Sequence, residues 1–267
     1  MTTLASTAHL PVGERIKRIV LPAVPFVLLL AVWGSAKFVF DIPRGILPDV
    51  ISVFRVPFTL TDQYLAHTIA SVQRLLLGFA VAAVSGLLVG LGAGLSRRFA
   101  EFIGPLSTFM NAISGIAWIP LAIAWFGIGT PMVVFIIWNS AFFLVLGNTI
   151  LGVRLVPRVL EQGLFTLGAS RFDVIRHVIF PGAMPHIVAG LRSGLGFGWR
   201  AVIAAELVGA TVGLGQWIFI AQEFRRTDII IAGAFTIGAI GLLTDRGILA
   251  PLERRTVERW GMAGRAT

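Results

Sequence analysis

Residues Leu155 to Leu191 read LVPRVLEQGLFTLGASRFDVIRHVIFPGAMPHIVAGL, the longest charge-bearing interruption in a chain otherwise made of apolar runs. Pro157 fits the first turn of a helix, where its missing N–H costs nothing. Gly168 fits the residue just past a helix end, which often has positive φ. Between them, apolar residues recur at the spacing of one helix face, at Leu160, Leu164 and Leu167. A short amphipathic helix is therefore predicted between Pro157 and Gly168.

A second short helix is predicted directly after this glycine. Ser170 and Asp173 have the spacing of a capping box, in which the serine hydroxyl accepts from the third amide and the carboxylate binds back. Pro181 disfavours helical backbone at the residue before it, so this helix is expected to end near Phe180. Residues 155–181 should thus form a bent pair of short helices, a shape suited to being held by another protein.

The composition places this chain in a membrane. Hydrophobic residues make up 56% of it and charged residues 13%, and the mean hydropathy of +0.87 is far too high for a soluble domain. The absence of cysteine excludes a disulfide framework, a thiolate nucleophile and any cysteine-based metal site. The net charge of +9 is dispersed at the ends of apolar runs. Positive-inside membrane topology explains this distribution better than nucleic-acid binding, so no nucleic-acid partner is expected.

Apolar runs of about 20 residues, the length that crosses a bilayer, predict an all-α membrane protein with six transmembrane helices. They lie at residues 19–40, 68–95, 104–126, 132–152, 186–208 and 229–250. The helix pair of residues 155–181 falls between the fourth and fifth spans. Residues 19–250 would form one domain between an N-terminal tail, 1–18, and a basic tail, 251–267. A secretory signal peptide is the weaker interpretation of the first run, because no small-residue cleavage site closes it.

Two further segments have a predicted role in packing. The connector at residues 41–66 is expected to carry an interfacial helix on the outer surface, with the apolar residues Ile51, Phe54 and Phe58. Gly86 and Gly90 of the second span form a GxxxG pair. Small residues let helices approach closely, and tight packing inside one subunit is the favoured interpretation over dimerisation.

Basic residues orient the predicted bundle. They gather near both termini and at the turns on the side of residues 155–181, for example at Arg97, Arg98 and Arg154, and fewer lie on the opposite side. Basic residues accumulate in cytoplasmic loops. Both termini and the helix pair are therefore expected in the cytoplasm.

Gly168 followed thirteen residues later by Pro181 resembles the loop through which permeases of bacterial ABC importers contact their ATPase. The sequence of residues 166–192 is most similar to that of the permeases for nitrate, sulfonate, taurine and bicarbonate. The resemblance covers most of the chain from about residue 67 onward, including SVQRLLLGFAVAAVSGLLVGLGAGLSRR (71–98), IAWFGIGTP (123–131), WRAVIAAELVGATVGLGQWIFIAQ (199–222) and PLERR (251–255). One departure is that the family's Glu-Ala-Ala is replaced by residues 162–164, Gln-Gly-Leu, with Glu161 one position early.

The resemblance implies a type I ABC importer fold in a bacterial inner membrane. Two permease subunits, expected as a homodimer, would meet two cytoplasmic ATPases and an external solute-binding protein. ATP and Mg²⁺ would belong to the ATPase, so this chain would carry neither a cofactor nor a catalytic residue. The residues expected at the ATPase contact are Glu161, Gln162, Gly168, Ala169, Ser170, Asp173 and Pro181. The residues expected to contact the binding protein are Trp217, Phe219 and Phe224.

Charged residues inside membrane spans are costly and are therefore candidates for function. Arg200 and Glu206 lie in the fifth predicted span, and the guanidinium of Arg200 suits an oxyanion crossing the subunit interface. The alternative is that each finds a fixed partner on a neighbouring helix and braces the bundle. Trp118 and Asn139 complete the expected substrate pathway, with helix packing as the alternative for the tryptophan. Charged residues near span ends are expected to reach the membrane surface as anchors, namely Arg74, Asp245 and Arg246.

Other motifs are assigned no chemistry. The 4 histidines are scattered without a second ligand at suitable spacing, so no metal site is expected. The glycine-rich residues 209–215 lack the preceding strand and the lysine of a phosphate-binding loop, so this chain is not expected to bind ATP itself.

The sequence predicts the permease subunit of an ATP-driven importer for a small solute, with an anion such as a sulfonate, taurine or nitrate expected. A secondary transporter driven by an ion gradient is the alternative, but such proteins favour inverted repeats, and no convincing internal repeat is seen. An intramembrane enzyme is disfavoured because the spans offer no cluster of catalytic groups.

Overall fold

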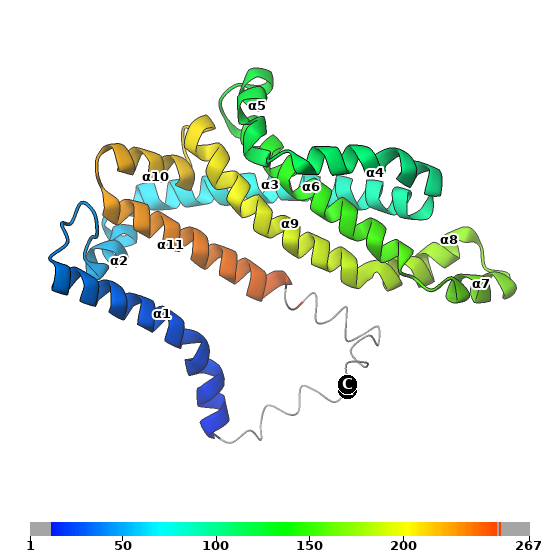
Figure 1. Cartoon of the computed structure of the whole chain (residues 1–267), viewed down its shortest axis with the longest axis horizontal. Coiled ribbons are helices and arrows are strands. Elements are labelled where there is room, and N and C mark those ends of the chain that lie inside the picture. The colour runs from blue at the N-terminus through cyan, green and yellow to red at the C-terminus, as the bar shows by residue number, and fades with distance from the viewer. Residues whose placement is uncertain (1–11, 250, 252–267) are drawn as a thin grey trace.

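The computed structural model describes residues 12–249 and residue 251, and within them every regular element is helical (Figure 1). The predicted tails, 1–18 and 251–267, lie largely outside the described residues. The elements in order are α1 (Val12–Phe40), α2 (Val50–Thr59), α3 (Thr61–Leu95), α4 (Arg97–Ala112), η1 (Gly115–Trp118), α5 (Ile119–Phe126), α6 (Thr130–Arg154), α7 (Arg158–Thr166), α8 (Arg171–Val174), η2 (Ile175–Ile179), α9 (Phe180–Gly209), α10 (Leu214–Glu223), α11 (Thr227–Thr244) and η3 (Asp245–Leu249).

Four of these helical segments are long and apolar enough to cross a membrane. They are Thr61–Leu95, Thr130–Arg154, Arg171–Gly209 and Thr227–Gly247. A fifth is counted if α4 and the segment η1–α5 form one broken span. The first predicted span lies in α1, whose residues Val24–Phe40 form a shorter apolar helix. Length and composition of the described helices thus identify four or five of the six predicted spans.

The third predicted span, residues 104–126, is not one helix. α4 ends at Ala112, and the segment η1–α5 leaves at an angle of 89° to it. Gly115 lies so close to α6 that a Cβ there would collide with the hydroxyl oxygen of Ser140. Pro120 lies in the first turn of α5, where no N–H donor is needed. The predicted span at residues 104–126 is thus present as a bent helix pair, which counts as one span if the pair crosses the membrane as a broken span.

The centre of the bundle is α6, which packs along α3 on one side and along α9 on the other (Figure 1). The α3 contact is made through glycines. A Cβ at Gly86 would lie 2.9 Å from the Cβ of Val145, and one at Gly90 would lie 2.6 Å from the Cβ of Thr149. The GxxxG pair therefore packs inside this subunit, as predicted, because only glycine permits so close an approach.

The second predicted loop helix does not end before Pro181. Instead α8, η2 and α9 form one helical path, Arg171–Gly209. η2 is a π-helical turn, in which the Phe180 N–H bonds to the Ile175 carbonyl five residues back. Pro181 then falls in the first turn of α9. Because the π turn changes the hydrogen-bond register just before the proline, its missing N–H does not interrupt the helix.

At the end of the bundle opposite α7 and α8, helices α2, α10 and α11 share a small apolar core (Figure 1). α2 is the helix predicted in the connector. It buries Val53 and Val56 and leaves its other face exposed, with Phe58 at 83%. An ion pair of 2.8 Å between Lys37 and Asp49 ties the connector to α1. The ammonium of Lys37 holds the pKa of the Asp49 carboxyl below its ordinary value.

Replacing Gly90 by valine should push α3 away from α6, because the new side chain would overlap Thr149. Overpacking of this kind costs about 1–3 kcal/mol, and we expect a lower Tm of the detergent-purified chain. Gly147→Val is the matched control, since a Cβ at Gly147 of α6 meets nothing within 4 Å. An equal loss of Tm in both variants, or none in either, would contradict the packing described.

Candidate functional site

The centre of the 155–181 loop has the predicted local geometry. α7 ends at Thr166, and Gly168 follows with a φ of +82°. The Ser170 N–H donates to Asp173 Oδ2 at 3.0 Å, and the Ser170 Oγ accepts from the Asp173 N–H at 3.3 Å. Both halves of the capping box are therefore confirmed. They set the direction in which α8 leaves the turn.

The loop projects from one end of the bundle (Figure 1). Several of its large apolar side chains are exposed. α7 buries none of its residues. Large apolar side chains of the loop are between 47% and 85% exposed, namely Val159, Leu160, Phe165, Leu167 and Phe172. Exposed apolar side chains on a segment outside the apolar spans are candidates for a contact with another protein.

The predicted coupling residues of the loop differ in their exposure. Those exposed are Gln162, Gly168 and Ser170, and those half-buried are Glu161, Ala169 and Asp173. Glu161 and Gln162 line a cavity of about 680 Å³ at the base of the loop, together with Arg154 and Arg158. Pro181 is buried in α9 and offers almost no surface to a partner. Its burial disfavours a direct contact with the ATPase, and its predicted part in ATPase coupling stays a prediction.

Two predicted pathway residues, Arg200 and Asn139, lie at one cavity of about 260 Å³ between α4, η1, α6 and α9. The lining also carries further amide and hydroxyl groups, from Asn111, Ser114 and Ser140, and its described residues include no carboxylate. The guanidinium of Arg200 lies over the Phe197 ring, 5.1 Å from its centroid. A cavity lined by one cation, neutral polar groups and no carboxylate favours an anion.

Trp118, the third predicted pathway residue, lines an adjoining cavity of about 310 Å³ between α4 and α6. The two cavities share Met110, Asn139 and Phe143. The second is largely aromatic, and the buried indole N–H of Trp118 has no hydrogen-bond partner among the described residues. The structure thus brings Arg200, Asn139 and Trp118 together.

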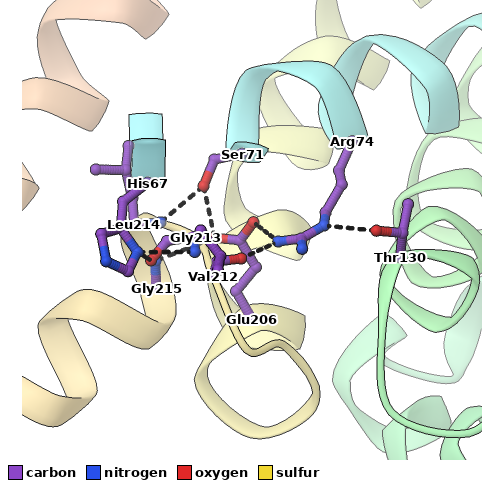
Figure 2. Close-up of polar contacts among 9 residues, drawn as sticks. All are labelled: His67, Ser71, Arg74, Thr130, Glu206, Val212, Gly213, Leu214 and Gly215. Carbon is purple, nitrogen blue, oxygen red and sulfur yellow. Dashed lines mark hydrogen bonds and ion pairs between the residues drawn. The ribbon is translucent and has the colours of Figure 1, made fainter. Parts of the chain in front are cut away.

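Glu206 lies elsewhere, in a buried ion pair at the α10 end of the bundle (Figure 2). Its side chain is 0% exposed, and its Oε1 accepts from Arg74 Nη1 at 2.8 Å. Its Oε2 accepts from Ser71 Oγ at 2.6 Å and from the Gly215 N–H at 3.1 Å. These contacts favour the bracing interpretation of Glu206. They leave the carboxylate no free surface for a solute.

The prediction that Arg74 reaches the membrane surface is wrong, because this residue is only 7% exposed. Asp245, also predicted as an anchor, pairs with Arg192 at 2.6 Å, whereas Arg246 is exposed. The sequence does contain a signal for the buried pair. Opposite charges in two different apolar runs cost least when they meet, which favours Glu206 pairing with Arg74 rather than with Arg200 on the same helix.

Of the three aromatic residues predicted to contact a binding protein, Trp217 is buried, so the prediction is wrong for this residue. Trp217 is 5% exposed and stacks on His67, with ring centroids 5.6 Å apart. It therefore packs α10 against α3. Phe219 and Phe224 are 42% and 74% exposed, and their contact with a partner stays a prediction.

Comparison with known proteins gives independent evidence on the family of this chain. The family model described as binding-protein-dependent transport system inner membrane component matches residues 82–256. The taurine transport system permease protein of Escherichia coli is 34% identical over 235 residues, covering 85% of this chain and 85% of that protein. The bicarbonate transport system permease protein of Synechococcus elongatus is 38% identical over 189 residues, covering 70% and 68%. The nitrate import permease protein of Synechocystis sp. is 31% identical over 242 residues, covering 86% and 87%.

Among solved structures, a chain of the MetNI methionine ABC transporter in an inward-facing conformation has a TM-score of 0.52 to this chain. It is 18% identical and covers 68% of this chain and 94% of its own, a likeness of fold alone. The family model and the sequence relatives support assignment to a family as well as to a fold, because their matches span most of the bundle and the projecting loop. The chain belongs to the inner membrane components of binding-protein-dependent transport systems, the permease family of ABC importers.

Proposed function

We propose that this chain is the membrane-spanning subunit that couples ATP hydrolysis to the import of a small anion. The observation that carries the coupling is the projecting loop of residues 155–181, where large apolar side chains such as Leu167 and Phe172 are exposed in the described chain. An uncovered apolar surface outside the spans needs a partner. In an ATP-driven importer that partner is the ATPase.

In the proposed assembly two copies of this chain form a homodimer that binds two cytoplasmic ATPases and one solute-binding protein. The family description supports the binding-protein partner.

Six spans result if α1 and the bent segment α4–α5 complete the four long apolar helices. An even number of spans puts both termini on the same side of the membrane as the loop. The basic residues on that side, such as Arg154 and Arg171, support a cytoplasmic position for the loop and the termini. ATP and Mg²⁺ would be held by the ATPase alone.

Movement of the loop would become movement of α9, because α8, η2 and α9 form one helical path. α9 also lines the Arg200 cavity, so its displacement would change the side from which this cavity opens. The permease itself would make and break no covalent bond. ATP binding and hydrolysis would shift the population between two packings that differ in access.

The Arg200 cavity supports an anionic solute. A guanidinium presents a planar fork of donors that matches oxyanions, and the Asn139 amide in the same lining can add a neutral donor. The solutes in the names of the relatives, taurine, bicarbonate and nitrate, all carry an anionic oxygen group. The binding protein would do most of the selection before the solute reaches this cavity.

Gly168→Val should abolish coupling without unfolding the bundle. At a φ of +82° a β-branched residue is strained. A strain energy of about 2 kcal/mol lowers the population of the correctly shaped loop roughly 30-fold. We expect a comparable loss of ATP-dependent uptake in proteoliposomes that contain the ATPase and binding protein.

Gly238→Val in α11 is the matched control, since neither glycine has a neighbour within 4 Å of an added Cβ, only Gly168 has positive φ, and Gly238 lies outside the loop. Normal uptake by Gly168→Val would refute the docking assignment. Uptake by the unmodified chain without any ATPase would favour an ion-gradient mechanism instead.

Arg200→Gln should lower uptake of the transported anion at matched expression. Loss of one charge-assisted hydrogen bond corresponds to at least about tenfold. Radiolabelled taurine, nitrate and bicarbonate would be tested in turn. Arg55→Gln removes an exposed arginine of α2 and should leave uptake unchanged. Intact uptake by Arg200→Gln would exclude this residue from the pathway.

A further inference from the structure

We propose that Arg74 and Glu206 are positioning residues for transport, because their ion pair locks the turn at residues 209–215 to the end of α9. α10 then moves with α9 as one body. The inference rests on the proposed function, since it treats α10 as part of the face that meets the binding protein. It adds a mechanical link between the ATPase loop at one end of the bundle and that face at the other.

Arg74 joins three segments at a single guanidinium (Figure 2). Its Nη1 donates to Glu206 Oε1 at 2.8 Å and also to the Val212 carbonyl oxygen in the turn. Its Nε donates to Thr130 Oγ1, at the start of α6, at 3.2 Å. Because the donors of a guanidinium are fixed in one plane, this arrangement restricts how α3, α6 and the turn can move relative to one another.

The same face of α3 also holds the backbone amides of the turn (Figure 2). Ser71 Oγ accepts from the Leu214 N–H at 2.8 Å. His67 Nδ1 lies 2.9 Å from both the N–H and the carbonyl oxygen of Gly213, and the tautomer of the ring decides which of the two it bonds. His67, Ser71 and Arg74 are spaced at four and three residues, so they lie on one side of the helix. The turn is therefore bound at several consecutive positions rather than at one.

The turn also fits closely around the Glu206 carboxylate. Gly213 has a φ of +153°, and a Cβ there would collide with the carboxyl group. A Cβ at Gly215 would lie 2.8 Å from the Cβ of Glu206. A turn packed this tightly cannot rotate about the carboxylate without losing the hydrogen bonds that hold it. The start of α10 is thus fixed relative to the end of α9.

α9 in turn reaches back to the loop. The helical path Arg171–Gly209 contains 39 residues, which corresponds to about 58 Å at 1.5 Å per residue. The capping box at Asp173 lies at one end of it, and Glu206 lies within its last turn at the other. A displacement of the loop should therefore reach α10 through the ion pair instead of being absorbed in a flexible turn.

The positioning role can be separated from a role in folding. Removing one partner of a buried ion pair leaves an uncompensated charge and destabilises the protein, whereas replacing both by apolar side chains of similar volume is often tolerated. The double variant Arg74→Met with Glu206→Leu keeps the site filled but removes the fixed hydrogen-bond geometry. Arg97→Gln with Glu101→Gln is the control, because it removes an exposed ion pair at the loop end.

The first test measures distances between spin labels in the full-length chain in lipid nanodiscs. The chain contains 0 cysteines, so labels can be placed at introduced cysteines alone. Labels at Arg176 and Gln222 connect the loop end to α10, and both positions are exposed. Labels at Arg176 and exposed Val208 lie on one helical path, about 48 Å apart.

In the Arg74→Met/Glu206→Leu variant, the 176–222 distance distribution should broaden roughly twofold, because the turn gains the freedom of a surface loop. The 176–208 distribution should stay as in the unmodified chain, and both should stay unchanged in the control variant. An unchanged 176–222 width would overturn the proposal. Equal broadening of both pairs would also overturn it, because the ion pair would then stabilise α9 itself.

The second test measures ATPase activity in proteoliposomes with the ATPase and the binding protein. The double variant should keep its basal ATPase rate, while stimulation by the loaded binding protein falls roughly tenfold, a typical coupling between two sites. Retained stimulation, or loss of the basal rate together with it, would overturn the positioning role. Failure of the unmodified chain to activate any ATPase would contradict the proposed function alone, since the spin-label distances would still decide the mechanical link.

Discussion

Close approach of helix backbones is the constraint on which this bundle depends. Along the α3–α6 contact, glycines of α3 at 78, 86, 90 and 94 face Ile137, Val145, Thr149 and Val153 of α6. On the other side of α6, Gly190 and Gly194 of α9 make similar contacts. Lipid gives no hydrophobic drive between apolar helices, so dispersion between closely packed surfaces must hold them together. Glycine opposite β-branched side chains provides such surfaces, and it places α6 at the centre.

The two ends of the bundle use opposite chemistry. At the loop end, apolar side chains such as Leu167 are uncovered and charges lie at the surface. At the α10 end, the charges of Arg74 and Glu206 are buried, and backbone groups of the turn from Val212 to Gly215 are hydrogen-bonded. An uncovered apolar surface suits a segment that gains a partner. A buried, fully bonded ion pair suits a junction that must keep one geometry. One helical path connects the two ends.

Features that depend on a few neighbouring residues could be predicted well. The capping box at Ser170 and the positive φ at Gly168 follow from short-range sterics and hydrogen bonding, and both are present. The rule that a proline ends the preceding helix was wrong at one position. Pro181 does not end a helix because a π turn precedes it. The 89° bend between α4 and the segment η1–α5 lies beside the close approach of Gly115 to Ser140 of another helix, which no local rule contains.

The sequence by itself determined that this chain is a helical membrane protein, that residues 155–181 form an amphipathic interruption, and that Arg200 is a candidate for meeting an anion. Composition, periodicity and capping are properties of short segments, so they can be read without the fold. Only the tertiary structure decided which distant residues contact one another. Arg74 and Glu206 are separated by 132 residues, and Trp217 turned inward to stack on His67. Pairing over such distances depends on how helices pack, because the burial of a charge or ring is set by its neighbours in space.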